Sequence, residues 1–191
     1  GAVARTVQAK NRDIVSVKDF GAVGDGVTDD TAAIQAAIDL FTSGNGTIIF
    51  PAGTYLVTST ITVAKDRIHL VGAGMWATVI KFAPTAADVC FLVDKGSTVA
   101  YQGSIDGFTF TSTDTTYAKT AIHLVDTSGY VVKNISSGAS GSWSNAGKGS
   151  IGLQINGRES GWISNLYLSC DRPLVVGPIT APHTASGIGI D

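Results

Sequence analysis

Two aspartates follow similar apolar segments by the same step and could act together as a pair of carboxylic acids. Asp94 comes after residues 89–93, and Asp126 comes after residues 121–125. If these segments are neighbouring strands in register, the two carboxyl groups lie about one strand spacing apart, roughly 5 Å. Retaining glycosidases hold two carboxyl groups about 5–5.5 Å apart. Asp94 and Asp126 are therefore candidate catalytic residues, and two exposed turn aspartates are the alternative interpretation.

One further acid and one aromatic residue lie where a site for sugars could use them. Glu159 lies in a turn between two expected strands, at residues 156–161, and is a third catalytic candidate. Trp143 lies in a Gly-, Ser- and Asn-rich segment over residues 138–150. An indole exposed on such a loop could stack against a sugar ring and bind substrate. The alternative is that Trp143 folds back onto the neighbouring strands.

The densest acidic cluster consists of Asp25, Asp29 and Asp30. A Ca²⁺ loop needs alternating oxygen ligands and a closing glutamate, and this segment does not have that pattern. We expect the three aspartates to form turns and to cap the helix that follows them.

The cysteines and histidines do not form a motif. Cys90 and Cys170 are 80 residues apart, and neither belongs to a CxxC sequence. The histidines are scattered without metal-ligand spacing, at His69, His123 and His183. The sequence therefore predicts two reduced thiols, no metal site and no cofactor.

The composition restricts the class of protein. Of 191 residues, 44% are hydrophobic, only 15% are charged and 23 are glycine, whereas ordinary soluble domains carry about 25% charged residues. Ser, Thr, Gly and Asn supply the polarity, which is typical of a β-rich fold with many turns. The net charge of −2 argues against nucleic acid as a partner. No apolar run reaches the roughly 18 residues that a membrane span needs, so no membrane contact is expected.

These candidate residues must be positioned by one helix and many short strands. Ile34, Ile38 and Phe41 recur at the spacing of a single buried helical stripe, which predicts a helix over residues 31–41. Downstream, short apolar or alternating segments are separated by Gly and Ser. Such a pattern indicates a sandwich, a barrel or a solenoid.

A repeat near 30 residues decides among these architectures. Similar segments recur at spacings of 32, 29 and 37 residues, centred on Cys90, Ile122, Ile151 and Ile188. A second series recurs between them at spacings of 27 and 31 residues, centred on Ile105, Val132 and Ile163. Two interleaved series with a shared period predict an all-β parallel solenoid with three strands per turn. Residues 173–176 are a possible third side.

One position in the second series should form a bend. Gly107, Asn134 and Asn165 occupy it, and Gly and Asn are the residues that tolerate left-handed backbone angles. We expect Asn134 and Asn165 to stack and exchange amide hydrogen bonds; two independent loop asparagines are the alternative. Just before the bend, Asp106 and Lys133 should form a surface ion pair.

The segment over residues 18–31, Lys-Asp-Phe-Gly-Ala-Val-Gly-Asp-Gly-Val-Thr-Asp-Asp-Thr, resembles the entry motif of the pectate-lyase-like superfamily. That superfamily includes polygalacturonases, pectate lyases, exo-glucanases and phage tailspike depolymerases. Residues 68–80 resemble its first turns, and residues 4–8 and 13–17 resemble tailspikes in particular. The resemblance implies a single-stranded right-handed parallel β-helix with one short N-terminal helix. The catalytic acid motifs of polygalacturonases are not found in the sequence.

The same resemblance implies a function and partners. A bacteriophage tailspike is a trimeric receptor-binding protein that recognises and depolymerises a bacterial surface polysaccharide, such as a capsule, an exopolysaccharide or an O-antigen. The expected chemistry is glycosidic hydrolysis by two carboxylates, or β-elimination by a base beside a neutralised uronate. The expected location is the virion tail, outside the cell, with other virion tail proteins bound through an upstream domain. The alternatives are a secreted cell-wall polysaccharide lyase or hydrolase, and a non-catalytic adhesive β-helix.

The repeat also predicts how the chain is divided. Residues 1–18 are expected to be a neck or linker, and residues 19–191 to be the N-terminal part of a β-helix domain. Residues 187–190 repeat the start of an earlier turn at residues 150–154, so the coil would be interrupted at its C-terminal end. A solenoid needs a polar cap over its last turn. We therefore expect a fragment that is inactive alone, with the remaining turns downstream in a parent protein.

Overall fold

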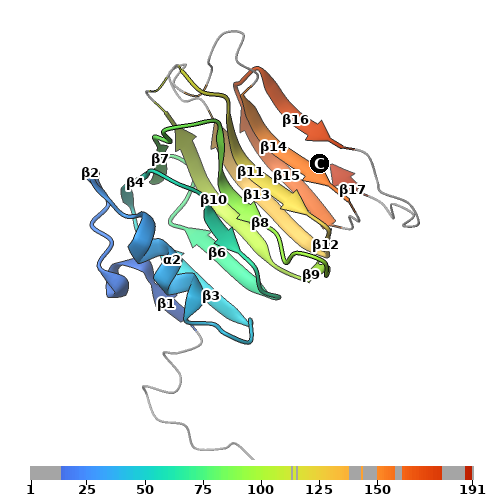
Figure 1. Ribbon diagram of the computed structural model, residues 1–191, viewed down its shortest axis with the longest axis horizontal. Helices are drawn as coiled ribbons and strands as arrows, with labels where there is room; N and C mark the ends of the chain where they lie inside the picture. Colours follow the sequence, from blue (N-terminus) through green and yellow to red (C-terminus); the bar gives the residue numbers. More distant parts are fainter. Residues whose placement is uncertain are drawn as a thin grey trace, which may run out of the picture.

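A computed structural model describes residues 14–112, 114, 116–137, 143, 150–157 and 161–177, and the backbone of residues 188–190. Its strands lie side by side in stacked layers that run from the N-terminal to the C-terminal end of the chain (Figure 1). One α-helix, α2 (Thr31–Asp39), and one short 3-10 helix, η1 (Val17–Phe20), lie at the N-terminal end. No helix within these residues is long and apolar enough to cross a membrane.

The strands belong to three sheets. Their bounds are β1 Ile14–Ser16, β2 Asp25–Asp29, β3 Gly46–Phe50, β4 Gly53–Val57, β5 Ile61–Val63, β6 Ile68–Gly72, β7 Thr78–Phe82, β8 Asp88–Val93, β9 Ala100–Tyr101, β10 Ser104–Thr111, β11 Lys119–Val125, β12 Thr127–Ser128, β13 Tyr130–Ser137, β14 Ile151–Asn156, β15 Gly161–Leu168, β16 Arg172–Val176 and β17 Ile188–Ile190. Sheet A has ten strands in the order β1-β3-β6-β10-β13-β15-β17, with β7 joining β10 to β4 and β2. Sheet B has the order β16-β14-β11-β8-β5, and β12 pairs with β9.

Neighbouring strands within a sheet come from successive turns of the coil. In sheet B, Ile122 of β11 pairs in parallel with Phe91 of β8 and with Leu153 of β14. In sheet A, Ile105 of β10 pairs in parallel with Val132 of β13. Because the chain returns to the same sheet about every 30 residues, as the repeat predicted, this is a parallel β-helix. The predicted fold class is confirmed.

The second series of the repeat is confirmed residue by residue. Val132 pairs with Ile105 on one side and with Ile163 on the other, and all three side chains are buried. Asp106 pairs with Lys133 in the same register, and Lys133 Nζ lies 3.3 Å from Asp106 Oδ2. The predicted ion pair is therefore present on the outer face.

The first series differs from the prediction by one or two residues. Phe91, and not Cys90, pairs with Ile122, and Ile122 pairs with Leu153 instead of Ile151. Strand β8 buries both Cys90 and Phe91. The strict alternation of inward and outward side chains, on which a register prediction depends, is interrupted there.

The last two strands also lie elsewhere than predicted. Strand β16, expected as a third side, pairs with β14 and extends sheet B. Its residue Arg172 pairs with Ile151, only 21 positions earlier, so a fixed period near 30 could not place it. Strand β17, expected to continue the first series at Ile188, pairs with β15 in sheet A.

The bend predicted in the second series is present. Gly107, Asn134 and Asn165 have φ angles of 82°, 53° and 51°. Asn165 Nδ2 donates to Asn134 Oδ1 at 2.7 Å, and Asn134 Nδ2 donates to Asp106 Oδ1 at 2.7 Å. The asparagines therefore form a hydrogen-bonded ladder along the coil, and the alternative of two independent loop residues is wrong.

Replacing Asn134 with alanine should lower the free energy of unfolding by about 2–3 kcal/mol. Two amide hydrogen bonds are lost, at about 1 kcal/mol each, and alanine tolerates the left-handed region less well than asparagine. Asn134→Gly keeps the backbone conformation and loses only the hydrogen bonds, so it should cost about 1–2 kcal/mol. Urea unfolding measures both variants. A smaller loss for alanine than for glycine would contradict this explanation.

Helix α2 covers one end of the coil, as its stripe of Ile34, Ala37 and Ile38 is buried. The side-chain amide of Gln35 pairs with the backbone of Thr62 in β5: Oε1 accepts from the N–H at 2.9 Å, and Nε2 donates to the carbonyl at 3.0 Å. Because β5 is the edge strand of sheet B, this amide takes the place of a further strand and protects the edge. The predicted helix is confirmed, and it ends at Asp39.

The acidic cluster has the structural role that the sequence predicted. Asp29 Oδ1 accepts a hydrogen bond from the backbone of Thr31, the first residue of α2, at 3.0 Å. Buried Asp30 accepts two backbone hydrogen bonds from the preceding turn, at 2.6 and 3.1 Å. Asp25 accepts two backbone hydrogen bonds within its own turn, both at 2.8 Å. Each carboxylate thus satisfies backbone N–H groups that would otherwise lack a partner.

Lys119, at the start of β11, is a buried cation. Its Nζ donates to Asp114 Oδ2 at 3.0 Å, to the Asp114 carbonyl at 2.7 Å and to the Tyr117 carbonyl at 3.0 Å. Burial alone would raise the pKa of Asp114, but hydrogen bonds from the backbone of Thr116 and from Lys119 hold it well below its usual range. The pair therefore depends on an ionised Asp114.

Acid should weaken the fold through this pair. A carboxyl group whose pKa is lower in the folded chain than in the unfolded chain contributes stability above the unfolded value, about 3.9, and that stability is lost as the pH falls through the folded value. Asp114→Asn should lower the free energy of unfolding at pH 7 and flatten its decline below about pH 4. Chemical denaturation over a pH series measures this. Parallel declines in both proteins would show that Asp114 is not responsible.

Candidate functional site

The two aspartates expected to form a carboxylate pair are not aligned. The register of β8 and β11 places Asp94 opposite Val125, with Asp126 one residue further along the chain. Asp94 Oδ1 accepts a hydrogen bond from the Gly96 backbone at 2.7 Å, and Asp126 has a left-handed φ of 46° at the bend after β11. The predicted stacking was therefore wrong, because the strands pair one residue away from the register that the repeat suggested.

Trp143 is buried, so its predicted role as an exposed platform for sugars is corrected. Its ring packs on Phe82 and Phe110, with centroids 6.3 and 6.1 Å apart, and is fully buried. Its Nε1 donates to the carbonyl of Ile151 at 3.2 Å. Burying an indole whose N–H has a partner is favourable, and the alternative in which Trp143 folds back onto the coil is the one found. Glu159, the third catalytic candidate, lies outside the described residues.

A histidine on the outer face of sheet B has a proton position fixed by its neighbours. His123 Nε2 lies 2.7 Å from Asn156 Oδ1, and Gln154 Nε2 donates to the same oxygen at 2.8 Å. Because an amide oxygen can only accept, the hydrogen bond requires a proton on Nε2. Leu92 pairs with His123, so Asp94, two residues further on, belongs to the same face. This face therefore carries an imidazole with one oriented nitrogen.

Two exposed aromatic side chains lie together on the outer face of sheet A. Trp76, between β6 and β7, is 53% exposed, and Tyr167, on β15, is 60% exposed. Their ring centroids are 6.1 Å apart and the ring planes are inclined by 59°. We refer to Trp76 and Tyr167 as the aromatic shelf. Since large apolar rings are usually buried, such an exposed pair marks a surface for interaction.

The turn that carries the shelf is held in an unfavourable conformation. Trp76 has a φ of 76°, which a bulky residue rarely adopts, and its N–H donates to Thr109 Oγ1 at 2.9 Å. Ser136 lies between Thr109 and Tyr167 in the register of three neighbouring strands. Its buried hydroxyl has no hydrogen-bond partner among the described residues. Backbone strain and an unsatisfied hydroxyl in one place are typical of a site shaped for function.

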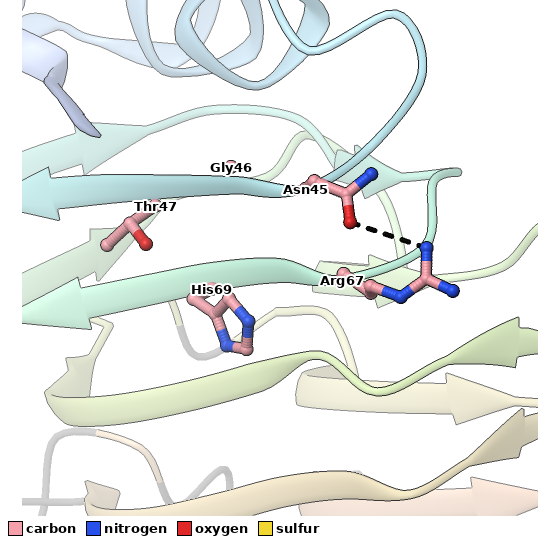
Figure 2. A pocket seen from close by; sticks show the side chains of 5 residues that line it. All are labelled: Asn45, Gly46, Thr47, Arg67 and His69. Atoms are coloured by element: carbon pink, nitrogen blue, oxygen red, sulfur yellow. Dashed lines mark hydrogen bonds between the residues drawn. The ribbon is translucent and has the colours of Figure 1, made fainter. Parts of the chain in front are cut away.

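A polar pocket of about 240 Å³ lies at the start of strands β3 and β6. Figure 2 shows the side chains that line it: Asn45, Gly46, Thr47, Arg67 and His69. Arg67 Nη1 donates to Asn45 Oδ1 at 3.3 Å, the dashed line in Figure 2, and Nε donates to Gln102 Oε1 at 3.2 Å. The guanidinium is thus held between two amides at the edge of the pocket.

His69 forms the other side of the pocket and is half-buried. Its Nδ1 lies 2.9 Å from Ser104 Oγ. Burial lowers the pKa of His69, so the imidazole is neutral at pH 7. Arg67 is consequently the charged group among the five residues that line the pocket.

Sequence reasoning did not identify the shelf, the pocket or the group around His123. The missed signal for the pocket is that Asn45, Arg67 and Gln102 each stand just before a strand of sheet A, in matching positions. Their spacings of 22 and 35 residues depart too far from the period near 30 to be recognised as a repeat. For the shelf, no pattern in the sequence connects Trp76 with Tyr167.

The cysteines form no bond to each other and both are free thiols, as predicted. Burial raises the pKa of Cys90 well above its usual value and also raises the pKa of Cys170, so neither is a reactive thiolate at pH 7. Within the described residues no three His, Cys, Asp or Glu side chains gather as metal ligands would.

Part of the sequence is similar to an epimerase and to a lyase. The chain is 55% identical over 74 residues to mannuronan C5-epimerase AlgE2 of Azotobacter vinelandii, covering 35% of this chain and 7% of the epimerase. It is 51% identical over 73 residues to alginate lyase 7 of the same bacterium, covering 35% of this chain and 8% of the lyase. The matches therefore span only a small part of the relatives' own length.

Solved structures share the coil over most of this chain. A protein described as Geobacillus virus E2 ORF18 has a TM-score of 0.61 at 23% identity, covering 88% of this chain and 41% of its own. The iota-carrageenase of A. fortis has a TM-score of 0.62 at 19% identity, covering 93% and 48%. PfbA, a surface adhesin of Streptococcus pneumoniae, has a TM-score of 0.59 at 22% identity, covering 81% and 38%. At these identities the likeness shows the fold alone.

A family described as rhamnogalacturonase A/epimerase, pectate lyase-like, matches residues 14–169. The match begins at the first residue of β1 and extends just past the end of β15. It thus includes the shelf, the pocket and His123, and it covers well over half of the chain. The chain therefore belongs to the rhamnogalacturonase A/epimerase, pectate lyase-like family.

Proposed function

We propose that this chain is part of a bacteriophage tailspike that binds a bacterial surface polysaccharide and depolymerises it. The observation that carries the proposal is the aromatic shelf, in which Trp76 and Tyr167 lie exposed and in contact on the outer face of sheet A. A shelf of this kind is suited to sugars more than to nucleic acids or membranes.

The chemistry of sugars explains this preference. One face of a sugar ring presents C–H groups that pack on an aromatic ring, and the rim presents hydroxyl groups that need hydrogen-bond partners. Beside the shelf, the Thr109 and Ser136 side chains are buried, and Thr109 Oγ1 accepts from the Trp76 N–H, so the two exposed rings are the groups that a sugar would contact. Only 15% of the chain is charged. A sparsely charged chain with two exposed rings in contact therefore matches a polysaccharide.

The virion location and the assembly belong to the same proposal. A phage protein is among the solved structures that share the fold, and residues 4–8 and 13–17 resemble the segment that precedes the coil in tailspikes. In this proposal the parent protein is a homotrimer, joined to other virion tail proteins through an upstream domain. The chain spans 41% of that phage protein.

The chemical step is proposed to be either hydrolysis of the glycosidic bond or β-elimination. The similar proteins include an epimerase and a lyase by name, and His123, whose Nε2 is held by Asn156, is proposed as the base through its other ring nitrogen. A base of this kind suits elimination, whereas hydrolysis uses two carboxyl groups. His123 is therefore the first residue to substitute once turnover has been observed.

The depolymerase function is tested by the products of the parent protein. The parent is incubated with purified capsules, exopolysaccharides and O-antigens from a panel of bacterial hosts, and the products are analysed by mass. Hydrolysis adds one water to each cleaved bond, and elimination leaves an unsaturated end. Either product supports the proposal. Binding without any cleavage would favour the alternative of a non-catalytic adhesive β-helix, for which the shared fold with the adhesin PfbA is the supporting observation.

A further inference from the structure

Six polar side chains form a grid on three neighbouring strands of sheet A. Their positions follow from the register, in which Thr47 pairs with His69 and His69 pairs with Ser104. Two residues before Thr47, His69 and Ser104 lie Asn45, Arg67 and Gln102, respectively. The same register places these three residues side by side. The grid includes the pocket of Figure 2. It is separate from the aromatic shelf, which lies beyond the left-handed bend of the strands.

The cation of this grid is positioned before any ligand arrives. Asn45, Arg67 and Gln102 all have left-handed backbone angles, with φ of 64°, 53° and 55°. This shared conformation brings the Arg67 guanidinium between the two amide oxygens that accept its hydrogen bonds. A guanidinium has five N–H donors, so two hydrogen bonds leave further donors available. Because the side chain is already ordered, less conformational entropy is lost when it binds an anion.

The Arg67 charge is not neutralised by a salt bridge within the described residues. Its two hydrogen-bond acceptors are neutral amides. The adjacent carboxylate, Asp66, is engaged elsewhere: Oδ2 accepts from Lys95 Nζ at 2.8 Å, and Oδ1 accepts from the Tyr101 backbone at 3.0 Å. The Arg67 charge also helps to lower the pKa of Asp66, but its hydrogen-bond acceptors are the two amides, so the exposed, ordered guanidinium can still receive an oxyanion.

The outward row that contains Thr47, His69 and Ser104 continues to an exposed aromatic ring. Ser104 pairs with Val131, and Val131 pairs with Trp162, whose side chain is 62% exposed. Neighbouring strands are about 4.8 Å apart, so Trp162 lies roughly 10 Å from Ser104 along the axis of the coil. A short run of sugar units laid along the axis could reach from the pocket to this ring.

We propose that the pocket binds an anionic substituent of a sugar unit, a carboxylate or a sulfate or phosphate ester, through Arg67. Thr47 and His69 contact the same unit, and the adjoining units extend over Ser104 towards Trp162. The volume of about 240 Å³ suits one sugar unit and not a longer segment. The inference rests on the proposed function, because it takes the ligand to be a polysaccharide, and it adds an acidic sugar as the substrate class.

The test uses the 191-residue chain and small probes, with the ring signals of His69 followed by NMR. Sodium glucuronate, inorganic sulfate and inorganic phosphate are added separately, with glucose as the neutral control. An anion bound beside His69 favours the charged imidazole, so at least one anion should shift the His69 signals and raise its pKa, whereas glucose should not. The comparison between glucuronate and the two inorganic anions identifies which oxyanion is preferred.

Variants attribute the response to the guanidinium. Arg67→Gln should weaken the anion response about tenfold or more, and Arg67→Lys should retain part of it, since lysine keeps the charge but not the fork of donors. Lys133→Gln, which removes a cation from the same sheet outside the pocket, should leave the response unchanged. No response to any anion, or an equal response in Arg67→Gln, would overturn the proposal.

Oligosaccharides separate this inference from the proposed function. Trp162→Ala should weaken binding of an acidic oligosaccharide and leave the response to glucuronate unchanged. Reducing the carboxyl groups of that oligosaccharide to alcohols should remove the contribution of Arg67. Replacing the shelf residues, Trp76 and Tyr167, should leave the glucuronate response intact. If polysaccharide binding at the shelf fails while the Arg67 response persists, the proposed function is wrong and the anion pocket remains. If the shelf binds polysaccharide and no Arg67 response is seen, only the anion pocket is rejected.

Discussion

Replacing Trp143 with alanine is expected to lower the free energy of unfolding by about 3–5 kcal/mol. The ring is fully buried and stacked on Phe82, with planes inclined by 22° and centroids 6.3 Å apart. Its edge contact with Phe110 and its hydrogen bond to the Ile151 carbonyl would be lost as well. Alanine would leave a cavity inside the coil and a buried carbonyl without its partner. Urea unfolding followed by circular dichroism measures the loss.

Trp162→Ala is the matched control for this prediction. Both substitutions remove an indole, but Trp162 is 62% exposed on the outer face, and substitutions at such positions usually change stability by no more than about 0.5 kcal/mol. A loss for Trp143→Ala as small as that for Trp162→Ala would mean that Trp143 is not packed inside the coil. It would also restore the original expectation that this residue is available to a sugar.

The second series of the coil could be predicted from the sequence because two independent signals agree there. Ile105, Val132 and Ile163 alternate with outward residues, and each precedes a residue that tolerates a left-handed bend. The register is defined by Gly107, Asn134 and Asn165. A shift by one residue would place other residue types at the left-handed bend, which they tolerate less well. The helix could be predicted equally well, because its apolar stripe depends only on the spacing of residues within the helix itself.

The first series could not be predicted to the residue, because burial does not alternate along its strands. Cys90 and Phe91 are both buried, and so are Ala121 and Ile122. The repeat alone therefore allowed registers that differ by one position, and the carboxylate pair of Asp94 and Asp126 depended on the wrong one. An error of one residue in a strand transfers a side chain to the other face.

The candidate sites depend on contacts that have no sequence signature. Trp76 and Tyr167 are 91 positions apart, and they meet because the turn carrying Trp76 is tied to Thr109 on a neighbouring strand. Arg67 adopts a left-handed angle that composition would assign to glycine or asparagine. For Trp143, the Gly- and Ser-rich surroundings suggested an exposed ring, whereas the ring is buried. The positions of all these side chains depend on packing between segments that are distant in the sequence.

Replacing both shelf residues with alanine, Trp76→Ala with Tyr167→Ala, is expected to weaken polysaccharide binding at least about thirtyfold. Aromatic anchors at an interface cost about 2 kcal/mol or more when truncated, and a thirtyfold loss corresponds to about 2 kcal/mol. Both side chains are more than half exposed, so the double variant should fold. Alanine keeps a Cβ atom at position 76, so the cost of the left-handed angle stays the same, and urea unfolding of the double variant separates the binding effect from unfolding. Tyr101→Ala, at an exposed tyrosine of β9 away from the shelf, is the matched control.

Affinity electrophoresis of the chain through gels that contain purified bacterial polysaccharides measures this binding directly. We predict that at least one polysaccharide of a host panel slows the chain, that the double shelf variant is slowed far less, and that Tyr101→Ala is slowed like the unmodified chain. Equal slowing of the double variant, or no slowing of the unmodified chain by any polysaccharide, would contradict the claim that this outer face of the β-helix binds glycans.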